Sequence, residues 1–191
     1  MKGKTAQQIL DVAQDLVQKR GYNAFSYADI SEQVGIRKAS IHYHFPSKDS
    51  LVRELVKCYR ERFRRIRQQI EQKNDSPEQQ LMQFALLYRD SLQQDQLCLC
   101  GMLTADWAVL PETVRDEIKG FFSDNQTWLA GVLERGCQAG VLRCQSSDEA
   151  EAKRILATCQ GAQLFSRLAD DKISAFDQMI QPLFTELLCK S

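Results

Sequence analysis

The sequence predicts an all-α protein of about nine helices. Gly and Pro are sparse, with nine and four in 191 residues, and few breakers over this length favour helices. Apolar residues make up 43% of the chain, which is enough for a packed interior. Apolar side chains also recur at helical spacing, whereas no segment of useful length alternates as a strand does.

The first helix is expected over about residues 5–20. Its apolar side chains form a single stripe at positions i, i+4, i+7 and i+8. These side chains are Ile9, Ala13, Leu16 and Val17. Gly21 follows directly, where a left-handed residue commonly ends a helix.

Two short helices are expected next, at about 27–33 and 38–44. Ser26 is a suitable N-cap for the first of them, and Gly35 allows a tight turn between the two. Pro46 ends the second, and Ser47 caps the helix that follows. Two short helices around a glycine turn form a helix-turn-helix, whose second helix enters the major groove of DNA.

A long helix over about 48–73 links this segment to the rest of the chain, and Asn74, Asp75, Ser76 and Pro77 end it. Five further helices are expected at about 77–94, 97–109, 112–139, 148–169 and 174–189. We therefore divide the chain into a DNA-binding domain, 1–50, and a helical effector-binding and dimerisation domain, 51–191. Charge and composition change inside the linking helix, near residue 65.

The charge distribution favours a nucleic-acid partner for the N-terminal part. Residues 1–67 hold fourteen Lys and Arg against seven Asp and Glu, a net charge of +7, and the remainder carries −7. Such asymmetry is typical of a basic DNA-facing end on an acidic body. Chance clustering of solvated charges is the alternative.

The second short helix has the side chains that reading DNA requires. Arg37 and Lys38 at its start can bind phosphates, and Lys48 can bind another. Short or planar polar groups on the helix can reach base edges. The full set predicted to bind DNA is Ser26, Tyr27, Arg37, Lys38, Ser40, His42, Tyr43, His44 and Lys48.

Residues 5–51 resemble the N-terminal domain of the Tet-repressor (TetR/AcrR) family. The shared pattern is a helix, then T/S-x-x-x-I-x-x-x-x-G, a recognition helix and F-x-S-K-x-x-L, here residues 45–51. This chain has His42 where the family commonly has Tyr. The resemblance implies a homodimeric repressor that binds palindromic double-stranded operator DNA and is released by a small-molecule effector.

In this family the C-terminal domain holds the effector pocket, so aromatic and polar side chains there are candidates for its lining. Asp106, beside Trp107 on an apolar segment, is the residue expected to orient a ligand. The candidates are Tyr59, Phe63, Phe84, Tyr88, Cys98, Met102, Asp106, Trp107, Phe121 and Trp128. Packing in the core is the alternative for each of them.

The last two helices are expected to form a four-helix dimer interface with those of a second copy. Their apolar seam is wider than one core-facing stripe needs. The interface residues predicted are Ile155, Cys159, Ala162, Phe176, Ile180, Leu183 and Leu187. The alternative is that the chain's own core uses the whole seam.

Other chemistry is less favoured. Cys98 and Cys100 could sense oxidants or electrophiles, but their apolar neighbours favour burial, and seven scattered cysteines suit reduced thiols in the cytoplasm. His42 and His44 point in different directions on a helix, which argues against a shared metal ion. No enzyme motif, cofactor site, signal peptide or membrane-spanning segment is expected. A DNA-binding protein without an effector remains the main alternative function.

Overall fold

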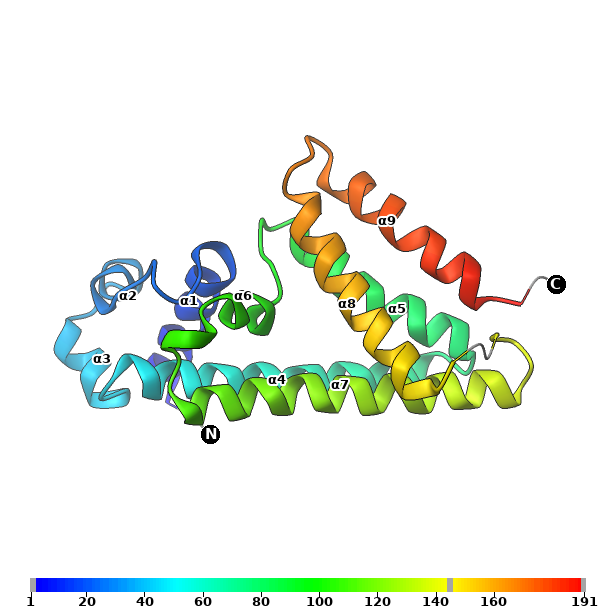
Figure 1. Cartoon of the computed structure of the whole chain (residues 1–191). Helices are drawn as coiled ribbons and strands as arrows, with labels where there is room; N and C mark the ends of the chain where they lie inside the picture. Colours follow the sequence, from blue (N-terminus) through cyan, green and yellow to red (C-terminus); the bar gives the residue numbers. More distant parts are fainter. Residues whose placement is uncertain (1–2, 144–145, 190–191) are drawn as a thin grey trace. The chain divides into compact units, whose positions relative to one another are not determined.

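The computed structural model describes residues 3–143 and 146–189 and confirms the predicted all-α fold (Figure 1). Within these residues the chain forms nine α-helices and one short 3-10 helix, η1. The elements are α1 (Lys4–Arg20), α2 (Tyr27–Val34), α3 (Lys38–His44), α4 (Lys48–Lys73), α5 (Pro77–Leu92), α6 (Leu99–Ala105), η1 (Trp107–Val109), α7 (Glu112–Gln138), α8 (Asp148–Ser166) and α9 (Lys172–Leu187). In the described part of the chain, no helix is both long and apolar enough to cross a membrane.

The helix predicted over 97–109 is shorter than expected. It ends at Ala105, and η1 follows. The break lies at Asp106, whose backbone leaves the helical region (φ −95°, ψ 18°). The carboxylate of Asp106 binds groups outside its own helix, as described below, and the sequence pattern gave no sign of this.

The chain divides into two compact units, which do not coincide with the predicted division at residue 50. Unit 1 contains Met1–Arg62 and Cys98–Phe121, and unit 2 contains Phe63–Leu97 and Phe122–Ser191. The boundary after Arg62 lies inside α4, close to the expected change near residue 65. Helix α6 and the first part of α7 belong with the helix-turn-helix, because they share its core.

In unit 1, α1 packs against α2, α3 and α6. The predicted apolar stripe of α1 is buried, and Ile30 of α2 and Ile41 of α3 are fully buried with it. Burial of such side chains contributes roughly 1.5–3 kcal/mol each to folding. This core fixes which face of α3 remains exposed.

The predicted helix caps in unit 1 are confirmed. The Ser26 hydroxyl accepts a hydrogen bond from the backbone N–H of Ala28, and Asp29 completes a capping box. Gly35 adopts the left-handed conformation that the turn requires, with φ 72°. The hydroxyl of Ser47 accepts from the N–H of Ser50 at the start of α4.

In unit 2, α5, α8 and α9 pack against one another (Figure 1). Their contact is mainly apolar, but it includes satisfied polar groups. The buried Gln163 side chain donates to the Tyr88 carbonyl at 2.8 Å and to Ser91 Oγ at 2.6 Å. Elsewhere in unit 2, Arg67 of α4 donates to Asn125 Oδ1 of α7 at 2.6 Å, and both side chains are buried. Such bonds offset the cost of burying polar groups.

Candidate nucleic-acid interface

Helix α3 buries one side chain and exposes most of the others. Ile41 is fully buried, whereas Lys38, His42 and Tyr43 are exposed, and the Tyr43 side chain is 84% exposed. A tyrosine is normally at least partly buried, because its ring is a large apolar surface. This exposed face therefore suits a partner that provides both polar and apolar contacts.

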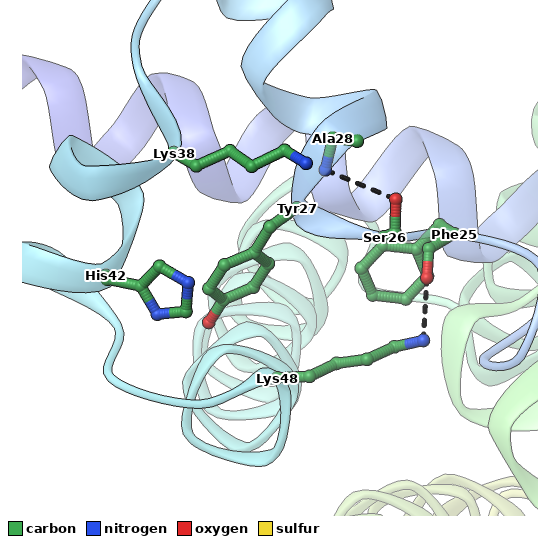
Figure 2. A pocket seen from close by; sticks show the side chains of 7 residues that line it. All are labelled: Phe25, Ser26, Tyr27, Ala28, Lys38, His42 and Lys48. Carbon is green, nitrogen blue, oxygen red and sulfur yellow. Dashed lines mark hydrogen bonds between the residues drawn. The ribbon is translucent and has the colours of Figure 1, made fainter.

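Side chains from α2, α3 and α4 surround a hollow of about 430 Å³ on this face (Figure 2). It is lined by Phe25, Ser26, Tyr27, Ala28, Lys38, His42 and Lys48. Five of these seven residues belong to the set predicted to bind DNA. The structure thus brings together side chains that are up to 23 positions apart in the sequence.

Tyr27 connects the start of α2 to the end of α3. Its hydroxyl donates to the carbonyl oxygen of Phe45 at 2.8 Å, and its ring centroid lies 4.8 Å from that of His42. Burial, with a smaller contribution from the charge of Asp49, raises the pKa of Tyr27 to about 12. Tyr27 is therefore a neutral donor that positions the recognition helix.

Ser26 already has two partners within unit 1. Its hydroxyl donates to Asp29 Oδ2 at 2.6 Å, and its backbone N–H donates to the same oxygen at 2.7 Å. These hydrogen bonds hold the pKa of Asp29 below its usual range. This arrangement shows that Ser26 caps α2. That Ser26 also binds DNA stays a prediction.

Lys48 is directed inward, as Figure 2 shows. Its Nζ donates to the Phe25 carbonyl oxygen at 2.7 Å and lies 4.5 Å from the ring centroid of Tyr22 and 4.3 Å from that of Phe25. Burial lowers the pKa of Lys48, and the charges of Asp106 and Asp49 oppose this shift. An ammonium group has three donors, so a phosphate contact is compatible with the carbonyl bond.

The remaining predicted residues lie at the ends of α3. Arg37 is exposed at the N-cap position, and Ser40 is partly buried. His42 Nδ1 lies 3.3 Å from the Pro46 carbonyl oxygen. The ring of His44 packs edge-on against that of Tyr43.

A second hollow, of about 380 Å³, lies beside His44 and includes Arg53 of α4. Arg53 was not predicted to bind DNA. It is 48% exposed, and its Nε lies 3.9 Å from Glu117 Oε1. Its position five residues after Lys48 on the same helix was the available signal, but a single arginine on a charged helix is not distinctive.

The residues predicted to line an effector pocket are divided between the two units. Tyr59, Cys98, Met102, Asp106, Trp107 and Phe121 belong to unit 1, and Phe63, Phe84, Tyr88 and Trp128 belong to unit 2. In unit 1 the rings of Tyr59 and Phe121 lie 5.4 Å apart. In unit 2 Phe84 lies 5.7 Å from Tyr88 and 5.6 Å from Trp128. These aromatic pairs are core contacts within each unit, and their part in a pocket stays a prediction.

Asp106, which was expected to orient a ligand, has protein partners. Its Oδ2 accepts from the backbone N–H of Tyr22 at 3.0 Å, and its Oδ1 accepts from Asn23 Nδ2 at 2.7 Å. Both oxygens therefore bind the turn between α1 and α2. This role follows from contacts across more than 80 residues, which no local pattern could indicate.

A cavity of about 320 Å³ lies between α5 and α9 in unit 2. Its walls are mainly apolar side chains, including Leu86 and Ile180. The ion pair of Arg89 with Asp177 borders it, with Arg89 Nε 2.8 Å from the carboxylate. None of the ten residues predicted to line an effector pocket lines this cavity.

The cysteine predictions have mixed outcomes. Cys98 and Cys100 are buried, as expected. Burial raises the pKa of the Cys100 thiol well above its usual value despite the nearby charge of Arg60. Cys137 is disulfide-bonded, which contradicts the expectation that all seven thiols are reduced. Cys144 lies outside the described residues.

The residues predicted to form the dimer interface are all buried within the single chain. Ile155, Cys159 and Ala162 of α8 pack in the core of unit 2 together with Phe176, Ile180, Leu183 and Leu187 of α9. Their side chains are therefore not a free surface. The seam is wide because α9 packs against both α5 and α8. The exposed apolar side chains in this region are others: Leu164 and Phe165 at the end of α8, and Leu168 just after it, at 55%, 61% and 84% exposure.

Known families match both parts of the chain. Residues 9–55 match the family described as "Bacterial regulatory proteins, tetR family". Residues 77–181, more than half of the chain, match "Tetracyclin repressor-like, C-terminal domain". The resemblance expected from residues 5–51 is thereby confirmed and extended to the second part.

Individual proteins agree with this. The crystal structure of a TetR family transcriptional regulator from Agrobacterium tumefaciens is 37% identical, covers 97% of this chain and 98% of its own, and has a TM-score of 0.92. A TetR transcriptional regulator from Legionella pneumophila is 29% identical over 97% of this chain and 95% of its own, with a TM-score of 0.84.

The biofilm operon icaADBC HTH-type negative transcriptional regulator IcaR of Staphylococcus aureus is similar over one short segment. It is 44% identical over 50 residues, which span 26% of this chain and 27% of IcaR. The match therefore covers about a quarter of that relative's length. Together with the helix-turn-helix geometry, the matches over both parts show that the chain belongs to the TetR family of bacterial regulatory proteins.

Proposed function

We propose that this TetR-family DNA-binding regulator is a homodimeric repressor that a small-molecule effector releases from a palindromic operator. The exposed face of α3 carries the proposal: Lys38, His42 and the 84% exposed Tyr43 project from a helix that Ile41 fixes to the core. A helix of this kind inserts into the major groove, where each base pair presents its own pattern of donors and acceptors.

Phosphate contacts position the helix, and base contacts provide specificity. Arg37 and Lys38 stand at the start of α3, and Lys48 stands at the start of α4. We assign these cations to the DNA backbone and assign His42 and Tyr43 to base edges. Arg53, beside the second hollow, is a further phosphate ligand in this proposal.

A dimer gives the operator its symmetry. Two recognition helices related by a twofold axis bind half-sites one helical turn apart, about 34–36 Å, or a multiple of this. We place the dimer contact at the exposed apolar residues at and just after the C-terminal end of α8: Leu164, Phe165 and Leu168. In a twofold interface the same patch lies on both subunits and covers itself. An exposed apolar cluster of this kind is typical of association surfaces.

Effector release is a coupling between two sites. An effector that weakens operator binding by some factor must itself be bound more weakly, by the same factor, when DNA is present. The family match supports an effector-binding C-terminal part. A DNA-binding protein without an effector is the competing function, and it predicts operator affinity that no small molecule changes.

A mobility-shift experiment tests the proposal. The purified protein is titrated onto DNA upstream of its own gene at fixed salt, with an unrelated fragment of equal length as the control. Specific repressors bind their sites typically 10³–10⁷ times more tightly than other DNA. Addition of a small-molecule fraction of cell extract is expected to release the protein. Equal binding to both fragments contradicts the proposal, and specific binding that no fraction changes favours the function without an effector.

A further inference from the structure

The carboxylate of Asp106 joins helix α6 to the turn between α1 and α2, inside unit 1. Its two oxygens accept from the Tyr22 N–H at 3.0 Å and from Asn23 Nδ2 at 2.7 Å. A hydrogen bond to a charged acceptor is about twice as strong as a neutral one. Two such bonds from one side chain fix both the distance and the orientation of the turn.

The turn has a shape that admits this carboxylate. Gly21 has a φ of 88°, a backbone conformation that residues other than glycine rarely adopt. A Cβ at Gly21 would lie 3.4 Å from Asp106 Oδ2 and 3.8 Å from Met102 Cε. These are ordinary van der Waals distances, so glycine is needed at position 21 for its positive φ and not for space.

Tyr22 also contacts the start of α4, on the surface proposed to bind DNA. Its hydroxyl donates to Asp49 Oδ1 at 2.7 Å, and the Lys48 ammonium lies 4.5 Å from its ring centroid. Burial is the main cause that raises the pKa of Tyr22 above its usual value, so the hydroxyl remains a donor. A single residue thus joins α6 to the first turn of α4, where the proposed phosphate ligand Lys48 lies.

We propose that Asp106 is a positioning residue, which holds the helix-turn-helix on α6 through Tyr22 and Asn23 and so sets the orientation in which Lys48 meets DNA. This inference rests on the proposed function. A displacement of α6 breaks both bonds of Asp106 and frees the turn.

A pair of exchanged side chains tests this. Asn23→Asp alone sets two carboxylates against each other. Asp106→Asn alone removes the charge that strengthens both bonds, but Asn23 can turn its amide so that its Oδ1 accepts from the new NH₂. The double variant Asn23→Asp/Asp106→Asn restores both bonds, because the new amide at position 106 accepts from Tyr22 and donates to the new carboxylate at position 23. The double variant also has the same net charge as the unaltered protein.

We expect Asn23→Asp to bind its operator about tenfold more weakly and Asp106→Asn to lose less, and we expect the double variant to recover most of the loss seen in Asn23→Asp. The slope of log K against log salt should become shallower in Asn23→Asp, because Lys48 no longer meets its phosphate, and should return in the double variant. Asp116→Asn, an exposed carboxylate on α7 that pairs with Lys119, is the matched control and should bind normally. Amide hydrogen exchange at Tyr22 should be faster in the single variants and slow again in the double variant.

A purely structural role for Asp106 would lower the melting temperature and leave the operator affinity of the folded protein unchanged. Normal affinity in both single variants, or no recovery in the double variant, overturns the proposal. Failure of the unaltered protein to bind any upstream DNA contradicts the proposed function instead. In that case the exchange measurement alone tests whether Asp106 holds the turn. Unchanged amide exchange at Tyr22 in the single variants overturns the proposal.

Discussion

The Nζ atom of Lys48 lies 2.7 Å from the carbonyl oxygen of Phe25. This bond places the ammonium group between the turn before α2 and the surface that faces DNA. Lys48 therefore has two roles in this account, because it stabilises unit 1 and supplies a phosphate contact. Two substitutions with different consequences distinguish these roles.

Lys48→Met keeps the apolar stem over the rings of Tyr22 and Phe25 but removes the ammonium group. We expect a loss of about 1 kcal/mol in the free energy of unfolding, the net value typical of one hydrogen bond. Operator affinity should fall as well. Urea denaturation and DNA titration on the same sample measure both effects. An unaltered unfolding midpoint would mean that the carbonyl bond contributes nothing.

Arg37→Ala is the complementary substitution, because Arg37 is exposed and outside the core. Operator binding should weaken by about tenfold without a change in stability. The slope of log K against log salt should become shallower by about 0.9 for each phosphate contact that is lost. A variant that binds with an unchanged slope would show that Arg37 does not contact the backbone.

The exposed leucines at the C-terminal end of α8 and just after it provide the test of the dimer. Leu164→Glu/Leu168→Glu places charges in the proposed interface, which is costly without partners. Sedimentation should show a folded monomer at micromolar concentration. Lys153→Glu, at an exposed position on the same helix, is the control and should remain dimeric. A dimer that persists in the double variant would place the interface elsewhere.

The cysteine thiols differ in their exposure to solvent. Cys98 and Cys100 are buried, and Cys189 is exposed. A thiol reagent should label Cys189 quickly and the buried pair slowly, because the thiolate is the reactive form and burial raises the pKa of Cys100. Mass spectrometry over a time course identifies the labelled positions. Rapid labelling of the pair with loss of DNA binding would favour the thiol-sensing alternative.

The capping box at α2 makes a pH-dependent contribution. The hydrogen bonds from Ser26 lower the pKa of Asp29 in the folded state, so this contribution is complete above the unfolded pKa, about 4, and is lost as pH falls through the folded pKa. Asp29→Asn should therefore be less stable than the unaltered protein at neutral pH and equally stable at low pH. Urea midpoints across acid pH measure this, and a constant difference at all pH values would contradict it.

Much of the fold could be predicted from the sequence, because local signals determine it. The helical stripe of α1, the Ser26 cap and the Gly35 turn each depend on residues close together in the chain, and all three are confirmed. The exposed face of α3 followed from the same periodicity. Elements of this kind determine which side chains of α3 are exposed, and the contact of these side chains with DNA stays a prediction.

The features that the sequence did not predict depend on contacts between segments that are far apart in the chain. The partners of Asp106 lie more than 80 residues away, so its role in the turn had no local signature. The apolar positions on α8 and α9 were identified correctly, but periodicity could not show that α5 packs against α9 and buries that side of the seam. The exposed residues Leu164 and Leu168 could be separated from the core only in three dimensions.

The central claim is that α3 reads a specific operator, and the most direct measurement is the affinity of the Tyr43→Ala variant for operator and for unrelated DNA at one salt concentration. Tyr43 is 84% exposed, so its removal should not affect folding. We predict a loss of affinity of about tenfold or more for the operator and little change for unrelated DNA, because base contacts carry specificity. Equal affinity of the variant and the unaltered protein for the operator would contradict the claim.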